Sequence, residues 1–217
     1  MTDYATAREN MVENQLRPSS VDDPRILDAF RAVPRELFLP ARLRPVAYQD
    51  EDIDLGNGRH LIEPLVLGRL LQASAPQPEE VALVVGCDTG YAAAVLSKLV
   101  ATVFLLVPDE VAAGPIEARL DEGGFDTIVV QPGDPRAGLP KEAPFNLVLL
   151  AGSVVEPPPA LLGQLEQRGR LAAVVEGGRA GMITIVTRIG DAYGAQRPFD
   201  GWTPPIPELR PEPAFEF

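Results

Sequence analysis

The sequence contains very little cysteine and histidine, the side chains that most often form cross-links or bind transition metals. Its 217 residues include one cysteine, Cys87, and one histidine, His60. A single cysteine excludes an intramolecular disulfide and fits a reducing compartment. One cysteine and one histidine also fall short of the ligand set that a zinc site needs, so we expect no metal site in this chain.

Long apolar runs and an excess of positive charge are also missing. No stretch approaches the roughly 20 apolar residues that a membrane-spanning helix requires. The N-terminal segment MTDYATAREN has acidic residues where a secretory signal has a basic start. The 31 acidic residues outnumber the 19 basic ones and give a net charge of -12, which disfavours attraction to nucleic acids and anionic lipids. We therefore expect a cytoplasmic protein that binds neither nucleic acid nor membranes.

The sequence does have enough apolar material for a large core. Hydrophobic residues make up 46% of the chain, and a length of 217 residues is typical of one large domain. We expect a single domain over residues 1–217, with an N-terminal helical and loop region at 1–78, a sheet-containing core at 79–190 and an extended tail at 191–217. The sequence does not indicate an oligomeric state.

Helical patterns come first along the chain. Residues 5–16 have the apolar spacing of a helix. A second helix is expected to begin at Pro24, behind a capping aspartate, and a third at Pro64. The prolines and glycines between residues 33 and 58 indicate mostly loop.

From residue 81 onward, short apolar runs alternate with helical segments. Near-continuous apolar runs are typical of strands that are buried on both faces of a parallel sheet. Strands are expected at 81–85, 102–107, 127–131, 145–152, 171–176 and 182–189, and helices at 91–100, 111–124 and 158–169. With right-handed crossovers, this order predicts an α/β fold with a doubly wound, mostly parallel sheet. The proline-rich C-terminal tail is expected to be an extended edge segment or a wrap over the surface.

A turn with two glycines follows the first of these strands and precedes a helix. Its sequence is GCDTGY, in which Gly86 and Gly90 flank Cys87 and Asp88. In an open α/β sheet the ligand lies outside the carboxyl ends of the strands. Such a turn brings backbone N–H groups towards that ligand, and glycine permits a close approach. We predict a nucleoside-type pocket at this turn, with a plain tight turn as the alternative.

The end of the next strand lacks the acid that such a pocket usually has. Nucleoside pockets normally place an acid there, about 20 residues beyond the first glycine, where it accepts hydrogen bonds from the ribose hydroxyls. The strand ends at Val107, which cannot accept a hydrogen bond, and Asp109 and Glu110 follow just beyond it. The sequence therefore predicts a nucleoside-type pocket with an altered ribose end.

Four segments, taken in order, carry a resemblance to a known family. They are MVENQLRPSSVDDPRILDAFRAVPRELFLP, AYQDEDIDLGNG, GCDTGYAAAVLSKL and PFNLVLLAGSVVEPPPALLGQLEQRGRL, and they cover roughly residues 8–175. Together they resemble the protein-L-isoaspartate O-methyltransferases. The resemblance implies a Rossmann-like methyltransferase fold for the core, S-adenosylmethionine as cofactor, and isoaspartyl carboxylates of damaged proteins as substrate. The implied partner is therefore a protein or peptide.

The resemblance also implies which positions hold the cofactor, and several of them differ from the family pattern. The acid on the strand before the turn is Val84 here, the middle glycine of the turn is Asp88, and the ribose-binding acid is Val107. The implied cofactor-binding positions are Gly86, Cys87, Asp88, Gly90, Tyr91, Val107 and Asp134, the last of which matches an acid near the adenine.

The substrate side differs as well. The family's Ser-Gln-Pro segment, which faces the substrate carboxylate, corresponds to Ile62, Glu63 and Pro64. The hydroxyl of that segment is therefore missing, and Glu63 would repel an anionic acceptor unless it is protonated. We assign no catalytic side chain, because methyl transfer to a carboxylate depends chiefly on proximity and orientation.

Two hypotheses for the function follow from these differences. Loss of the ribose-binding acid removes charge-assisted hydrogen bonds of roughly 1.5–3 kcal/mol each, and Asp88 adds a carboxylate where the backbone should approach the cofactor. In the first hypothesis, the chain is a methyltransferase that has eroded cofactor and substrate motifs and acts on a protein carboxylate. Alternatively, it is a catalytically inactive protein of this fold that binds a protein or a small ligand.

Several other residues have two interpretations each. Cys87 is either a redox-sensitive thiol or, as we favour, a small residue that fills a tight turn. His60 is either a general base beside the substrate segment or, as we favour, a surface or hinge residue without a catalytic role. Tyr91 either packs against the sheet or lines the pocket. The acids expected in a solvated loop, or in contact with a lysine-rich partner, are Asp50, Glu51, Asp52 and Asp54. The aromatic residues expected to anchor the tail, or to form a partner-binding motif, are Trp202, Phe215 and Phe217.

Overall fold

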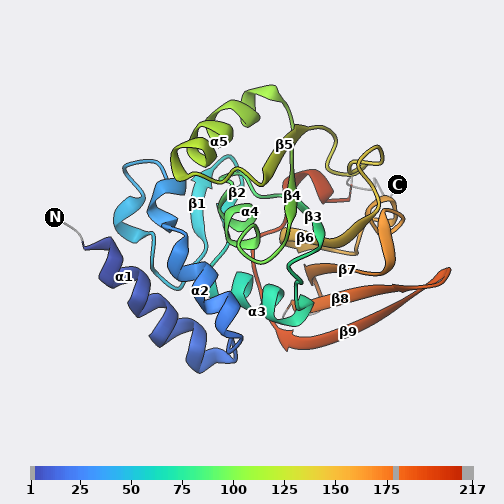
Figure 1. Cartoon of the computed structure of the whole chain (residues 1–217), viewed down its shortest axis with the longest axis horizontal. Helices are drawn as coiled ribbons and strands as arrows, with labels where there is room; N and C mark the ends of the chain where they lie inside the picture. Colours follow the sequence, from blue (N-terminus) through green and yellow to red (C-terminus); the bar gives the residue numbers. More distant parts are fainter. Residues whose placement is uncertain (1–2, 178–180, 212–217) are drawn as a thin grey trace, which may run out of the picture.

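The computed structural model describes residues 3–177 and 181–211. At its centre is a seven-stranded sheet with the order β5-β4-β3-β6-β7-β8-β9 (Figure 1). The strands from β5 to β7 in this order pair in parallel, and β8 and β9 are antiparallel to their neighbours. Their bounds are β3 Val81–Val85, β4 Thr102–Val107, β5 Ile128–Pro132, β6 Phe145–Val154, β7 Leu165–Val175, β8 Met182–Ile189 and β9 Ala192–Asp200. The predicted doubly wound, mostly parallel α/β sheet is confirmed.

Helices and a small second sheet surround this core. The helices are α1 Tyr4–Met11, α2 Pro24–Ala32, α3 Pro64–Ser74, α4 Tyr91–Leu96, α5 Glu110–Gly123 and α6 Pro159–Leu162. The short helical turns are η1 Val12–Leu16, η2 Arg17–Ser19, η3 Arg35–Phe38, η4 Arg44–Val46 and η5 Pro207–Leu209, and the second sheet pairs β1 Ile53–Gly56 with β2 Arg59–Leu61. Within the described residues, no helix is both long enough and apolar enough to cross a membrane.

The sheet separates two apolar cores, because successive residues of a strand point to opposite faces. In β3, Val84 packs in the larger core with helices α2 to α5, whereas Leu83 and Val85 pack in the smaller core. Helix α6 has only four residues, and the smaller core also contains Ile206 and Leu209 from the C-terminal tail. The tail therefore covers part of a sheet face that α6 cannot cover by itself.

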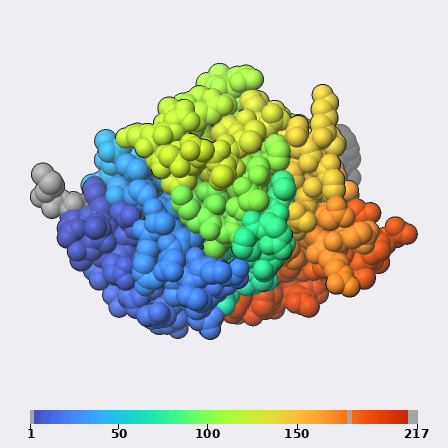
Figure 2. Space-filling view, viewed as in Figure 1, coloured from blue at the N-terminus to red at the C-terminus, as the bar shows by residue number. Residues whose placement is uncertain are grey.

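The N-terminal helices form where the sequence predicts them. Met11, Val12 and Leu16 are fully buried, and α1 continues into the π-helical turn η1. Asp23 caps α2, since its carboxylate accepts a hydrogen bond of 2.9 Å from the backbone N–H of Arg25. Figure 1 shows α2 between α1 and α4. In the space-filling view the N-terminal residues form one side of the molecule, with the middle of the chain beside them and β8 and β9 beyond (Figure 2).

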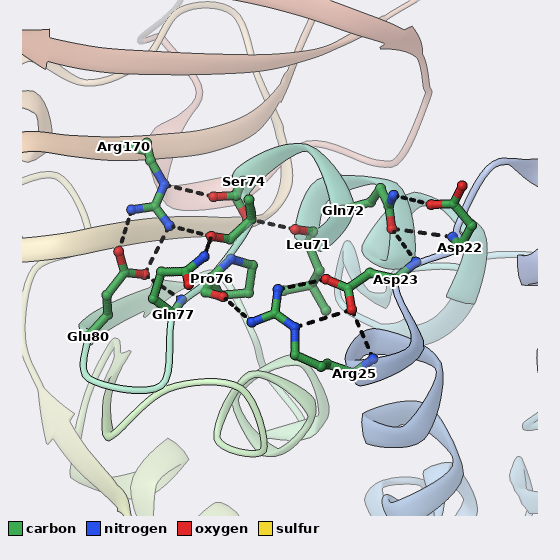
Figure 3. A network of polar contacts seen from close by, with 11 residues as sticks. Asp22, Asp23, Arg25, Leu71, Gln72, Ser74, Pro76, Gln77, Glu80 and Arg170 are labelled. Atoms are coloured by element: carbon green, nitrogen blue, oxygen red, sulfur yellow. Dashed lines mark hydrogen bonds and ion pairs between the residues drawn. The ribbon is translucent and has the colours of Figure 1, made fainter.

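A polar network attaches α3 to the sheet and to α2 (Figure 3). From β7, Arg170 donates a hydrogen bond of 2.7 Å to the carbonyl oxygen of Ser74 at the end of α3, and it donates to both carboxylate oxygens of Glu80 at 2.6 and 2.9 Å. On α3, the side-chain oxygen of Gln72 accepts a hydrogen bond of 3.1 Å from the backbone N–H of Asp23. These contacts fix the N-terminal region against the sheet.

The predicted helix at 158–169 is wrong over most of its length. Helix α6 ends at Leu162 and strand β7 begins at Leu165. A Cβ atom at Gly169 would lie 2.8 Å from the carbonyl oxygen of Phe145, so the backbone of β6 approaches this position closely. Leu165 pairs with Phe145 of β6, and this strand pairing overrides the helical composition of the segment. The helix predicted at 91–100 likewise ends early, at Leu96.

The tail contains both arrangements that the sequence suggests. It begins with the edge strand β9, which pairs with β8. The chain then returns across the carboxyl end of β6, where Ser153 and Pro205 form an isolated parallel bridge. This return brings residues 201–211 close to the glycine turn, which follows the neighbouring strand β3.

Candidate functional site

The glycine turn joins β3 to α4 with a backbone that only glycine adopts easily. Gly86 and Gly90 have φ angles of +78° and +87°, in the region that side chains disfavour. A Cβ atom at Gly90 would also lie 3.1 Å from Ile116 of α5. Inside the turn, the hydroxyl of Thr89 accepts a hydrogen bond of 3.2 Å from the backbone N–H of Tyr91. The two glycines therefore set the path of the chain at this point.

A groove runs from this turn along the end of β4 to α5, and we call it the main groove. Its volume is about 510 Å³, which lies within the usual range for small-molecule sites. The turn contributes Gly86, Cys87 and Asp88, the strand end contributes Val107, and α5 contributes Ile116. The main groove therefore joins most of the implied cofactor positions beside the carboxyl ends of β3 and β4.

On the other side of Gly86 lies a much smaller space, the small cavity, whose volume is about 10 Å³. Its lining includes Ile62, Gly152 and Ile206. A Cβ atom at Gly86 would lie 2.6 Å from Cδ1 of Ile206, and one at Gly152 would lie 2.7 Å from Cγ1 of the same side chain. The isoleucine of the tail thus fills the space that the two glycines leave open.

Three charged side chains connect the hairpin, the turn and the tail. Arg59 of β2 forms ion pairs with Asp88 of the turn and with Glu208 of the tail. Burial raises the pKa of Asp88 to about 6, although the positive charge of Arg59 opposes that shift. We call this arrangement the clasp (Asp88, Arg59 and Glu208). Asp88 therefore faces an arginine of this chain.

The acids implied for the nucleoside end are not available in the main groove. Val107 lines the groove and is buried. Asp109 also lines it, but its carboxylate caps α5 by accepting a hydrogen bond of 2.9 Å from the backbone N–H of Ala112. Asp134 is exposed and does not line the groove, and its carboxylate accepts a hydrogen bond of 2.9 Å from the backbone N–H of Arg136.

Two other implied cofactor positions are occupied by buried side chains. Cys87 lines the main groove, and burial raises the pKa of its thiol. A redox-sensitive thiol with a lowered pKa is therefore not found, and the small-residue interpretation agrees with the structure. Tyr91 points away from the main groove into the larger core, where its ring lies 5.5 Å from that of Phe38 and 4.8 Å from the guanidinium carbon of Arg35.

The substrate-side segment is divided between two surroundings. Ile62 lines the small cavity, and its carbonyl oxygen accepts a hydrogen bond of 2.8 Å from the fully buried Arg35. Glu63 lines neither the main groove nor the small cavity. Burial raises its pKa to about 7, with Asp52 adding to the shift. Pro64 is the first residue of α3.

His60 is partly buried, and the structure tests neither the general-base interpretation nor the favoured one of a surface or hinge residue without a catalytic role. This residue lies two positions before Ile62 and lines the small cavity with it, together with Gly86. Among the described residues, its Nδ1 atom is buried and has no hydrogen-bond partner. The structure therefore adds this imidazole to the groups that surround the small cavity.

The expected solvated acidic loop and the expected aromatic anchors need correction. Asp52 is partly buried and accepts hydrogen bonds of 2.9 Å from the backbone N–H of Glu63 and from the hydroxyl of Thr203. The other loop acids, Asp50, Glu51 and Asp54, are exposed as predicted. Trp202 is 63% exposed, so it does not anchor the tail, whereas Ile206 does. Phe215 and Phe217 lie outside the described residues.

The sequence analysis missed Arg59, Ile206 and Glu208. For Ile206 there is a weak signal in the segment TPPIPEL, where single aliphatic residues stand among prolines. An apolar residue in such a segment indicates a wrap that packs on the protein. No signal in the sequence pairs Arg59 with Glu208, because they are 149 positions apart.

Comparison with protein families gives a match over most of the chain. The family model described as protein-L-isoaspartate (D-aspartate) O-methyltransferase matches residues 6–200. A protein-L-isoaspartate O-methyltransferase of Koribacter versatilis strain Ellin345 is 37% identical over 175 residues, which cover 81% of this chain and 79% of that protein. Another, of Methylorubrum extorquens strain PA1, is 39% identical over 173 residues, which cover 80% of this chain and 75% of that protein.

Solved structures show the same fold. A protein-L-isoaspartate O-methyltransferase superposes with a TM-score of 0.80 at 19% identity, covering 94% of this chain and 67% of the other. A Plasmodium falciparum protein of this type, solved in complex with S-adenosyl-L-homocysteine, gives a TM-score of 0.75 at 16% identity and covers 96% of this chain and 100% of the other. At such identities the structures support the fold alone.

Proposed function

Because this chain belongs to the protein-L-isoaspartate O-methyltransferase family, we propose that it transfers a methyl group from S-adenosylmethionine to a carboxyl group of a protein or peptide. The names of its relatives point to the isoaspartyl carboxylate as acceptor. The observation that supports this proposal most directly is the main groove, because it lies beside the glycine turn at the strand ends where α/β sheets bind ligands. The net charge of -12 argues against a nucleic acid as substrate. A cytoplasmic location stays a prediction.

The main groove has room for the nucleoside part of the cofactor. Its volume is about 510 Å³, and Leu106, Val107 and Ile116 give it an apolar wall. An adenine ring can pack against such a wall, and the turn at Gly86 leaves the backbone accessible. The ribose hydroxyls would find no free carboxylate at Val107, so we expect their hydrogen bonds to be made to water or to the backbone.

The methionine part does not fit in the form that the structure describes. If the nucleoside lies in the main groove, the methionine part must extend past Gly86 towards Ile62, where only the small cavity of about 10 Å³ remains. Ile206 occupies that space, and Asp88 faces Arg59 and the tail. Binding of the complete cofactor therefore requires residues of the tail to move.

The acceptor side needs no acid or base from the protein, because the sulfonium methyl that the cofactor supplies is already reactive towards a carboxylate. The residues of this chain then have positioning roles. Arg35 fixes the backbone of Ile62, and His60 offers a polar group beside it. We propose that this imidazole takes the place of the hydroxyl that Ile62 lacks.

The family match over residues 6–200 favours the enzyme over the hypothesis of an inactive binding module. A methylation assay separates the two. Purified protein, labelled S-adenosylmethionine and a peptide with one isoaspartyl residue are expected to give a base-labile methyl ester. The same peptide with an ordinary aspartyl residue is the control and is expected to give none.

A pocket variant keeps the assay informative if the activity of the natural chain is low. The double change Asp88→Gly with Val107→Glu restores the family pattern, and we expect it to bind S-adenosylhomocysteine about tenfold or more tightly by calorimetry. No methyl ester from either protein, and no binding at millimolar ligand, would contradict the proposed function.

A further inference from the structure

The segment 203–210, which we call the strap, lies across the glycine turn. Its central side chain, Ile206, is 3% exposed. A Cβ atom at Gly86 would lie 2.6 Å from this side chain and one at Gly152 would lie 2.7 Å from it, both too close for a real contact. Glycine at these two sites leaves room close to the backbone, and an isoleucine of the same chain fills that room.

The clasp holds the strap at a second point. Arg59 stands between two carboxylates, Asp88 of the turn and Glu208 of the strap, and pairs with both. Without the guanidinium the two carboxylates would repel each other. The contact between turn and strap at this point therefore depends on one arginine that comes from the β1–β2 hairpin.

The strap has few other polar contacts with the sheet. Pro204, Pro205 and Pro207 have no backbone N–H to donate. Among the described residues, the backbone contacts between the strap and β6 are two hydrogen bonds of 3.0 Å, which Ser153 makes with Pro204 and Ile206. Thr203 donates a hydrogen bond to Asp52, and the carbonyl oxygen of Arg210 accepts one of 2.5 Å from Arg136. A segment with so few ladder bonds can leave the sheet without breaking the sheet itself.

We propose that the strap is an autoinhibitory segment, which keeps Ile206 in the methionine end of the cofactor site and is held there by the clasp. The inference rests on the proposed function, because it takes the small cavity to be that end. A protein whose binding-competent form is a minor population binds its ligand more weakly by that fraction. With the strap open in roughly 1–10% of molecules, the apparent affinity for S-adenosylhomocysteine falls about 10- to 100-fold.

The test compares variants of the full chain in calorimetry with S-adenosylhomocysteine. Glu208→Gln removes one ion pair of the clasp and keeps the apolar contacts of the strap, but Glu208 also lines the main groove, so this variant changes the charge of that groove as well. Ile206→Ala removes the side chain that fills the site. The control is Glu13→Gln, which makes the same change of charge at a carboxylate of η1 that pairs with Arg17 and Arg31.

Glu208→Gln is expected to bind roughly two- to fivefold more tightly than the natural chain, because a partly exposed ion pair contributes at most about 1 kcal/mol, and Glu13→Gln is expected to match the natural chain. Ile206→Ala should show a similar or larger gain. If it fails to fold, Glu208→Gln alone decides the question. Measurable binding by the natural chain with no gain in Glu208→Gln overturns the strap proposal and leaves the proposed function intact. No binding at millimolar ligand in the natural chain, the clasp variants or the restored pocket variant overturns both.

Fluorescence gives an independent measure of the movement. The single tryptophan of the chain, Trp202, directly precedes the strap. Its fluorescence anisotropy is expected to fall when S-adenosylhomocysteine is added, because the opened strap rotates more freely. Unchanged anisotropy at saturating ligand would show that the cofactor binds with the strap in place, and that result overturns the proposal.

Discussion

Two arginines organise two polar networks in this protein, and the networks differ in what they connect. Arg170 lies on a central strand and donates to backbone carbonyls at the end of α3 as well as to both oxygens of Glu80. Arg59 lies on a short hairpin and pairs with two carboxylates, one on a turn and one on the tail. The side chain of Arg170 is 17% exposed and that of Arg59 is 30% exposed.

This difference shows that one fold can contain both a fixed network, that of Arg170, and a network that can be released, that of Arg59. Backbone carbonyls at a helix end cannot move without the helix, so the network of Arg170 is as stable as the elements that it joins (Figure 3). The partners of Arg59 are side chains on a turn and on a proline-rich segment, so they can separate without the loss of a helix or of a central strand. We therefore expect loss of Arg170 to affect stability and loss of Arg59 to affect access to the site.

The largest effect should come from breaking the first network. Arg170→Met leaves Glu80 as a buried carboxylate without its partner, and we expect the free energy of unfolding to fall by about 3–5 kcal/mol. Urea denaturation followed by circular dichroism measures this. The control is Arg17→Met, which removes an exposed pair with Glu13 and should cost about 1 kcal/mol or less. Equal losses in the two variants would show that the network of Arg170 is not an anchor.

A smaller effect concerns the pH dependence of the clasp. Burial raises the pKa of Asp88 from 3.8 to about 6, so the folded protein binds this proton more tightly than the unfolded chain. The contribution of Asp88 to the free energy of unfolding therefore decreases as pH rises through this window, whereas Asn at this position does not titrate. We therefore compare the free energies of unfolding of Asp88→Asn and of the natural chain at each pH. Between about pH 4 and pH 7 the stability of the variant should increase by about 1–2 kcal/mol relative to that of the natural chain. A difference that stays constant in urea denaturation across this range would disprove the shift.

The smallest effect on stability should come from Arg59. Arg59→Met is expected to lower the free energy of unfolding by about 1 kcal/mol, because the pairs that it loses are partly exposed. Amide hydrogen exchange measured by mass spectrometry should nevertheless become faster in peptides that cover the strap and stay unchanged in peptides of α3 and β7. Uniform acceleration over the whole chain would mean that the two networks do not differ in kind.

Much of the fold was predictable, because its signals are local. Apolar runs of strand length indicated six of the seven strands of the central sheet, and GCDTGY placed the turn between β3 and α4. The false helix at 158–169 has a simple reason. The composition of that segment suits a helix, and its pairing with β6 is a long-range contact that composition does not encode.

The candidate site was predictable only in part. Gly86, Gly90 and Val107 were identified from motif position, and the structure places Gly86 and Val107 in the lining of the main groove, whereas Gly90 packs against α5. Asp134 and Tyr91 were implied by resemblance alone, and the structure places them outside the main groove. A motif fixes where a residue stands along the chain, whereas the direction of its side chain depends on what packs beside it.

The sequence by itself determined the alternation of strands and helices, the glycine turn and the family, because each is written in neighbouring residues or in long, ordered similarity. The tertiary structure alone decided that an isoleucine from the tail fills the space beside Gly86 and that Arg59 connects Asp88 with Glu208. The physical reason is distance along the chain. These contacts join residues from three separate regions, and only the folded sheet brings them within reach of one another.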